Sequence, residues 1–132
     1  MNAKSIVRLL LLLGVYAWIP FAAGAEETKT VALVIDYSDG VKKHFPAIEW
    51  REGMTVLELM EAARRHPRGI QFEYRGRGIT AFLFQIDDVK NQGRGRNWVY
   101  RVNDRLADRS FAVQALEPSD RVVWEFSEYR GN

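Results

Sequence analysis

The stretch VALVIDY, at residues 31–37, constrains the fold more than any other part of the chain. Leu33 and Ile35 alternate with Val34, so an extended backbone here presents apolar side chains on both of its faces. A strand with two apolar faces is usually central in a sheet or covered on both sides. The rest of the chain must therefore supply elements that shield this strand from water.

The first of these elements is a second strand directly after it. Ser38, Asp39 and Gly40 form a turn signal, because each tolerates the backbone conformations that reverse a chain. Residues 42–48 then alternate between polar and apolar side chains. The two strands are predicted to form a hairpin.

A single helix is predicted after the hairpin. Thr55 has the side chain of a good N-cap, and Glu58 three residues later completes a capping box. Apolar residues follow at helical spacing, and Pro67 and Gly69 end the pattern. This is the one segment of the chain with a clear helical period.

The second half of the chain is predicted to be mostly strands, with a polar loop over residues 87–97. The last strand places Trp124 on an apolar face and is expected to bury it. The predicted strands of this half cover residues 70–74, 79–86, 98–103 and 120–126. One helix laid across a mixed sheet is an α+β arrangement, and the order of elements fits the β-grasp.

Residues 1–25 have the pattern of a signal peptide. Lys4 and Arg8 precede an apolar run, and Ala23-Gly24-Ala25 is a small-residue cleavage site. The alternative, an uncleaved anchor, is less favoured because the run is slightly short for a membrane span. We therefore expect a domain of residues 26–132 that is exported, periplasmic or extracellular, with no membrane attachment after cleavage.

Charge and cysteine content narrow the function. The chain has 19 Lys and Arg and 17 Asp and Glu, and Lys4 and Arg8 account for the excess. A neutral exported domain is a poor nucleic-acid binder, so we expect no nucleic-acid partner. Residues 64–109 are locally basic, which favours an anionic group there. The chain has no cysteine, so it must fold without disulfides.

Signals of catalysis and metal binding are weak. There is no cysteine nucleophile and no G-x-S-x-G turn. His44 and His66 come from different elements and do not suggest a shared site. Asp87 and Asp88 are adjacent, so on an extended chain their carboxylates point to opposite sides, and a turn is the simpler role. The sequence therefore predicts no enzyme, no catalytic residue and no metal site.

The stretch RGRNWVYRVNDR, at residues 94–105, offers a candidate ligand site. Its arginines could clasp a carboxylate or phosphate, and its aromatic residues, two apart, share one face of a strand and could stack on a planar ligand. The alternatives are a solvated loop and aromatic residues packed in the core. The candidate residues are Arg94, Arg96, Asn97, Trp98, Tyr100 and Asn103.

Several stretches together resemble the transcobalamin-like C-terminal domain family, a β-grasp family mostly without an assigned function. They are, in order, VALVIDYSDG, GMTVLELMEAA, FLFQIDDVKN, WVYRVND and LEPSDRVVWEF. The chain departs from the family pattern in two turns, with Asn103-Asp104 in place of Asn-Gly and Ser119-Asp120 in place of Gly-Asp. The resemblance implies cobalamin as a possible ligand. In such carriers a helical domain completes the site, so this chain would supply half of a shared site.

Two functions follow as expectations. The first is a non-enzymatic module that binds a small planar or anionic ligand, with a corrinoid as one possibility. The alternative is an envelope module that binds a protein or a cell-surface polymer through a sheet edge or the polar loop.

Export is the first prediction to test. We predict that the protein recovered from the compartment outside the cytoplasm begins at Glu26, because cleavage follows the small-residue site. Intact-mass spectrometry of that protein measures the N-terminus. An intact form beginning at Met1 as the sole product would contradict the prediction.

Overall fold

The computed structural model describes residues 27–128, so the predicted signal peptide and its cleavage site lie outside the described residues. The elements follow the order of a hairpin, one helix and then further strands. They are β1 (Thr30–Asp36), β2 (Lys42–Glu49), α1 (Val56–Arg64), β3 (Phe72–Arg75), a 3-10 turn η1 (Gly78–Thr80), β4 (Phe82–Ile86), β5 (Val89–Lys90), β6 (Asn97–Val102), β7 (Arg105–Leu106) and β8 (Arg121–Ser127).

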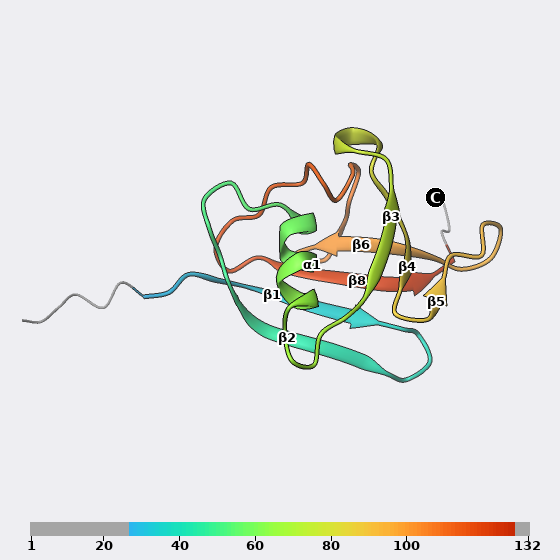
Figure 1. Cartoon of the computed structure of the whole chain (residues 1–132), viewed down its shortest axis with the longest axis horizontal. Coiled ribbons are helices and arrows are strands. Elements are labelled where there is room, and N and C mark those ends of the chain that lie inside the picture. Colours follow the sequence, from blue (N-terminus) through green and yellow to red (C-terminus); the bar gives the residue numbers. More distant parts are fainter. Residues whose placement is uncertain (1–26, 129–132) are drawn as a thin grey trace, which may run out of the picture.

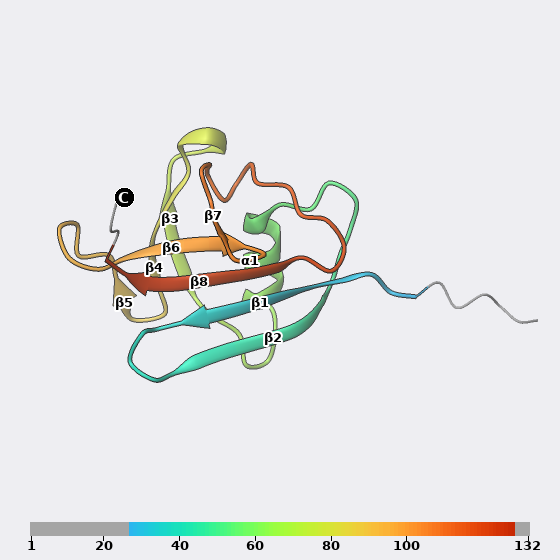
Figure 2. The ribbon, with the colours of Figure 1, turned by 180° about the vertical axis from the view of Figure 1, so that it is seen from behind.

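The strands form two sheets, where the sequence predicted one. The larger sheet has the order β2-β1-β8-β6-β7, and its central pair, β1 and β8, is parallel. The smaller sheet has the order β3-β4-β5. Helix α1 lies across one face of the larger sheet, beside β3 and β4 (Figure 1). Within residues 27–128, no helix lies in front of the opposite face of this sheet (Figure 2). The fold is α+β, as predicted, with its strands divided between two layers.

Strand β1 occupies the interior position that its two apolar faces predict. It pairs with β2 on one side and with β8 on the other. Leu33 and Ile35 are fully buried, and Val34 on the opposite face is buried as well. The predicted hairpin with β2 is also present.

Helix α1 begins at the predicted cap. The Glu58 backbone N–H donates to Thr55 Oγ1 at 3.3 Å, and the Thr55 backbone N–H donates to Glu58 Oε2 at 3.0 Å. Both halves of the capping box are therefore formed. The helix buries its apolar side, including Leu59 and Met60, against the sheet. None of the helices among residues 27–128 has the length and hydropathy needed to cross a bilayer.

The predicted strand over residues 79–86 is half wrong. Its first part is the 3-10 turn η1, and only Phe82–Ile86 are extended. Gly76 sets this corner: its φ is +79°, and a Cβ there would lie 2.3 Å from the Thr80 backbone oxygen. A side chain at that position would clash, so the chain reverses tightly between β3 and η1. The reversal turns Ile79 outward instead of into a strand face.

Asp87 is a structural centre, whereas the sequence assigned it only a turn. Its backbone has φ +50°, which fits the turn. Its carboxylate also accepts hydrogen bonds from the Tyr37 hydroxyl, from Lys43 Nζ at 3.0 Å and from the Gln71 backbone N–H at 2.9 Å. The carboxylate thereby joins the end of β1, strand β2 and the start of the smaller sheet. Its neighbour Asp88 is exposed, as expected for adjacent side chains.

These contacts stabilise the ionised form of Asp87. Burial by itself would raise the pKa of Asp87, but the hydrogen bonds from Gln71, Tyr37 and Lys43 outweigh it and lower the pKa. Burial and the bond to Asp87 raise the pKa of Tyr37, so its hydroxyl remains a donor. A group whose pKa is lower in the folded state stabilises the fold above its unfolded pKa.

We predict that Asp87→Asn lowers the free energy of unfolding at pH 7 by about 1–3 kcal/mol, because it weakens a set of charge-assisted bonds. Asparagine tolerates the positive φ, so the turn itself persists. The difference from the parent should shrink as the pH falls below about 4, where the parent carboxylate becomes protonated. Urea unfolding at pH 7 and pH 2.5 measures this, with the exposed Asp88→Asn as control. An equal difference at both pH values would contradict the assignment.

Candidate functional site

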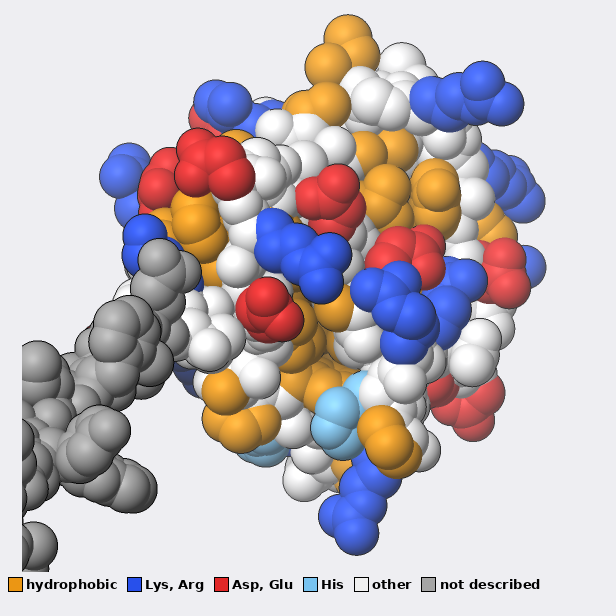
Figure 3. Space-filling view, turned by 60° about the vertical axis from the view of Figure 1, so that its left-hand side comes forward, with side chains coloured by type: hydrophobic (Ala, Val, Ile, Leu, Met, Phe, Trp, Pro, Cys, Tyr) orange, Lys and Arg blue, Asp and Glu red, His pale blue; other side chains and the backbone are white. Residues whose placement is uncertain are grey.

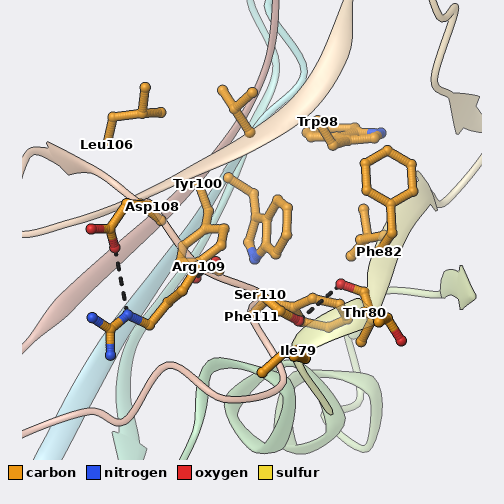
Figure 4. Close-up of a pocket in the computed structure, with 15 residues that line it drawn as sticks. Ile79, Thr80, Phe82, Trp98, Tyr100, Leu106, Asp108, Arg109, Ser110 and Phe111 are labelled. Atoms are coloured by element: carbon orange, nitrogen blue, oxygen red, sulfur yellow. Dashed lines mark hydrogen bonds and ion pairs between the residues drawn. The ribbon is translucent and has the colours of Figure 1, made fainter. Parts of the chain in front are cut away.

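A cavity of about 480 Å³ lies between the two sheets, at the end that carries η1 and the segment after β7. Figure 4 shows Phe82 on one side of it, Leu106, Asp108 and Arg109 on the other, and Ile79 below. Its walls therefore come from η1, β4, β6, β8 and residues 106–111, which are far apart in sequence.

The inner wall of the cavity is aromatic. Trp124 of β8 packs on Tyr100 of β6 with ring centroids 4.9 Å apart, and Phe111 meets Trp124 edge-on at 5.6 Å. Trp98 packs against Phe126 at 5.2 Å. Such offset and edge-to-face pairs are favourable beyond the area that they bury. All five rings belong to the buried core, and all but Phe126 line the cavity.

The rim of the cavity is apolar and exposed. Ile79 is 83% exposed, Phe82 58% and Leu106 42%. Among residues 27–128 there are five large apolar side chains that are at least 39% exposed, and three of them line this one cavity. Single exposed apolar residues are ordinary on protein surfaces, but a group of them around a hollow indicates a binding surface.

The segment of residues 106–111 is held in place by its backbone and one hydroxyl. Ser110 Oγ donates to the Ala81 backbone oxygen at 2.8 Å, which ties the segment to the start of β4. The Leu57 backbone N–H donates to the Phe111 oxygen at 3.0 Å, which ties it to α1. The Tyr100 hydroxyl donates to the Arg109 backbone oxygen at 2.6 Å. Burial raises the pKa of Tyr100 to about 12, so this donor keeps its proton at neutral pH.

The six residues expected to bind a ligand are spread along strand β6 and do not converge. Arg94 and Arg96 are exposed in the loop before the strand, and Asn97 begins it. Asn103 follows its other end, roughly 20 Å away for a strand of this length. There the Asn103 side chain donates to Asp120 Oδ1 at 2.7 Å and accepts from the Arg121 backbone N–H at 2.9 Å, so it holds a turn.

The expected turn geometry at Asn103-Asp104 is formed without glycine. Asn103 has φ +49° and Asp104 has φ +68°, which are the two left-handed residues of a tight hairpin turn. Ser119 likewise has φ +71° where the resembled family has glycine. The two departures in sequence therefore leave these turns in place.

Trp98 and Tyr100 share one face of β6, as predicted, but they are not an exposed stacking platform. Both are buried. Trp98 Nε1 donates to the Val89 backbone oxygen at 2.8 Å. The core alternative is therefore the correct one for their packing, and their edges contribute only to the inner wall of the cavity.

The loop of residues 91–97 is built from hydrogen bonds within itself. Asn97 Nδ2 donates to the Gly93 oxygen at 2.8 Å, and the Arg96 backbone N–H donates to Gln92 Oε1 at 2.9 Å. Asn91 spans the base: its Nδ2 donates to the Leu83 oxygen at 3.1 Å and its Oδ1 accepts from the Trp98 N–H at 2.8 Å. The arginine side chains take no part in these bonds.

The two histidines lie along one groove, which sequence reasoning did not foresee, but they do not form a metal site. His44 is exposed on β2, and its neighbour Phe45 is buried against His66 with ring centroids 5.4 Å apart. Because alternate residues of a strand face opposite ways, His44 points away from His66. Within residues 27–128, no three His, Cys, Asp or Glu side chains gather as metal ligands would.

Charge has no single sign on the face that Figure 3 shows. On the face shown in Figure 3, lysine and arginine side chains are interspersed with aspartate and glutamate, and apolar groups project at its upper and lower ends. An anionic ligand would therefore be recognised by a local group and not by a broad field.

Sequence reasoning missed the residues that define the cavity. Ile79 and Phe82 were assigned to one apolar strand, whose side chains would be expected in the core. Leu106 and Arg109 lie in a return segment without a recognisable motif. The stretch ITAFLF contains more apolar residues than one buried strand face requires. This excess was the signal from which exposed apolar residues could have been predicted.

Comparison with known proteins gives a family and a fold. The family model described as "Domain of unknown function (DUF4430)" matches residues 53–128, more than half of the chain. Among solved structures, a candidate metal-binding protein from Ruminococcus gnavus matches with a TM-score of 0.61 and 11% identity, covering 77% of this chain and 99% of that one. At this identity the match shows a shared fold only. No curated protein matches the chain.

We predict that Asn91→Ala lowers the free energy of unfolding by about 1–3 kcal/mol, because it leaves a carbonyl and an N–H unpaired at the loop base. The double variant Arg94→Ala/Arg96→Ala is the matched control and should stay within about 0.5 kcal/mol of the parent, as at ordinary surface sites. Chemical denaturation measures both. A larger loss in the arginine variant than in Asn91→Ala would show that the arginines hold the loop.

Proposed function

The chain belongs to the DUF4430 family, and from the geometry of its cavity we propose that it is an exported, non-enzymatic module that binds a small, planar, largely apolar molecule. The observation that carries the proposal is the ring of exposed apolar residues, Ile79, Phe82 and Leu106, around a hollow with an aromatic wall. Export rests on the pattern of residues 1–25.

The size and lining of the cavity support a small ligand. Its volume of about 480 Å³ is within the range of about 300–1,000 Å³ that is typical of small-molecule pockets. Covering the rim would remove apolar surface from water, at about 25 cal/mol for each Å². The aromatic wall is already ordered by core packing, so apolar contact with it would cost a ligand little ordering of side chains.

The hydroxyl groups of the cavity support binding over catalysis. The hydroxyls of Tyr100, Ser110 and Thr80 each donate to a backbone oxygen of the protein. A general acid or base must be free to exchange a proton with a substrate. Hydroxyls committed to the backbone hold the walls together instead.

More specifically, we propose that the ligand is a corrinoid and that the fold is a β-grasp. Their support is the resemblance to transcobalamin-like domains in sequence, and for the fold also the parallel pair β1–β8 with one helix across the sheet. The exposed rim would then face the second domain that completes a shared site. Metal binding, which the description of the Ruminococcus gnavus protein suggests, lacks a matching ligand cluster among residues 27–128.

A second candidate function is the binding of an envelope protein or polymer. The observation in its favour is Ile79, which projects from the η1 corner and is 83% exposed. A partner that seats this side chain would cover the same rim from outside. Such a partner would depend on Ile79 more than on the inner wall.

The neutral fluorescent probe N-phenyl-1-naphthylamine tests the small-molecule proposal. We predict that it binds, and that Phe82→Ser weakens binding at least about fivefold, because a half-exposed ring no longer covers the ligand. Stability should change little, since Phe82 is outside the core cluster. Probe fluorescence gives the affinity, and denaturation gives the stability.

Val41→Ser is the matched control, because Val41 is an exposed apolar residue in the distant β1–β2 hairpin. It should leave probe binding unchanged. Equal losses in Val41→Ser and Phe82→Ser would show non-specific adsorption and reject the cavity as the site. Cyanocobalamin, measured by quenching of tryptophan fluorescence, tests the corrinoid form in the same proteins.

A further inference from the structure

We propose that the ligand of this cavity carries a carboxylate. The guanidinium of Arg109 binds this carboxylate, and the indole N–H of Trp124 donates a hydrogen bond to it. The inference rests on the proposed function and adds the chemical class: a planar apolar acid. It follows from which polar groups of the cavity already have hydrogen-bond partners.

The neutral hydroxyls of the cavity are committed donors. Tyr100, Ser110 and Thr80 donate to the backbone oxygens of Arg109, Ala81 and Arg77. A ligand that needed donors from these groups would have to break the bonds that hold the walls. The donors left for a ligand are therefore elsewhere.

Arg109 is the first of them. In the described part of the chain, its guanidinium has one polar contact, a 3.5 Å approach of Nε to the carboxylate of the adjacent residue Asp108. Both side chains are well exposed, at 58% and 85%. The terminal nitrogens are thus free to form the paired bonds with which arginine recognises a carboxylate.

The indole N–H of Trp124 is the second donor left for a ligand. Trp50 Nε1 donates to the Leu116 oxygen at 2.7 Å, and Trp98 Nε1 donates to the Val89 oxygen at 2.8 Å. Trp124 Nε1 is buried and has no hydrogen-bond partner among residues 27–128. A buried donor without a partner is destabilising, and an acceptor brought in by a ligand would remove that cost.

The Trp124 donor is covered by its neighbours, because less than 1 Å² of Nε1 is exposed. The rings of Tyr100 and Phe111 pack against this indole, with centroids 4.9 and 5.6 Å away. A ligand oxygen reaches Nε1 only when one of these rings turns. The indole N–H signal of Trp124 therefore reports the event directly.

The two charged residues of the cavity allow a test, because removing one charge or the other should change the affinity for an acid in opposite directions. Among the lining residues that belong to 27–128, Asp108 is the one acidic residue and Arg109 the one basic residue. A ligand carboxylate would replace Asp108 as the partner of Arg109. Removing the Asp108 charge should then strengthen the binding of an acid, and removing the Arg109 charge should weaken it, while a neutral analogue responds to neither change.

The probes are naphthalene-2-carboxylate and its neutral analogue naphthalene-2-carboxamide, measured by calorimetry and by ¹H–¹⁵N spectra of labelled protein. The acid is expected to bind more tightly than the amide. Arg109→Gln should weaken acid binding about two- to fivefold, and Asp108→Asn should strengthen it by a similar factor, the range of an exposed ion pair. Arg94→Gln, in the loop before β6, is the matched control and should have no effect.

The indole signals supply an internal comparison. The acid should shift the Trp124 N–H signal, and the already paired signals of Trp50 and Trp98 should move less. Loss of one signal in Trp124→Phe assigns it. An unmoved Trp124 signal on saturation with the acid would remove the indole from the site.

Different results would overturn the carboxylate inference and the proposed small-molecule function. Equal affinity for acid and amide, with both weakened by Phe82→Ser, would overturn the carboxylate and leave the apolar cavity as the binding site. Weakening of the acid by Arg94→Gln instead of Arg109→Gln would move the anion site to the loop and also overturn the inference. Absence of binding by both probes at millimolar concentration, or binding that ignores Phe82→Ser, would overturn the proposed function together with the inference.

Discussion

The packing of Trp124 against Tyr100 and Phe111 is the contact on which the arrangement of this protein depends. It joins β8 to β6 and to the return segment, residues 106–111. The ring centroid of Trp124 is 4.9 Å from that of Tyr100 and 5.6 Å from that of Phe111. Strand β8 is also the parallel partner of β1, so it connects this packing to the first strand among residues 27–128. Large aromatic side chains supply much buried area in a small domain without disulfides, where each contact is a large share of the total stability.

The same packing explains why a cavity exists. The helix covers one part of the larger sheet, and the smaller sheet covers another (Figure 1). The cavity, lined by Tyr100 and Trp124, lies between the larger sheet, η1, β4 and residues 106–111. The return segment, fixed by Ser110 and Phe111, closes the gap only in part. An aromatic floor with an open rim is the result. Asp87 has a similar linking role at the other side of the molecule, where a single carboxylate gathers donors from three segments.

Local signals in the sequence predicted the elements whose formation depends on neighbours in the chain. The capping box of Thr55 and Glu58 is formed as expected, and so are the β1–β2 hairpin and the buried face of β8 around Trp124. Prediction from the sequence failed where contacts with distant segments of the chain determine the local structure. Residues 79–86 are apolar enough for one strand, but Gly76 and Thr80 close a corner that breaks it. Asp87 has the pattern of a turn residue, and no local pattern predicts its bonds to Tyr37 and Lys43.

The sequence by itself determined the α+β class, the single capped helix and the interior position of β1, because hydrophobic period and capping act over a few neighbouring residues. It also gave the shared face of Trp98 and Tyr100, since strand residues two apart always point the same way. Only the tertiary structure decided that this face is core, and that Ile79, Phe82, Leu106 and Arg109 surround a cavity. Burial depends on what packs on top of a residue, and here the covering segments come from distant parts of the chain.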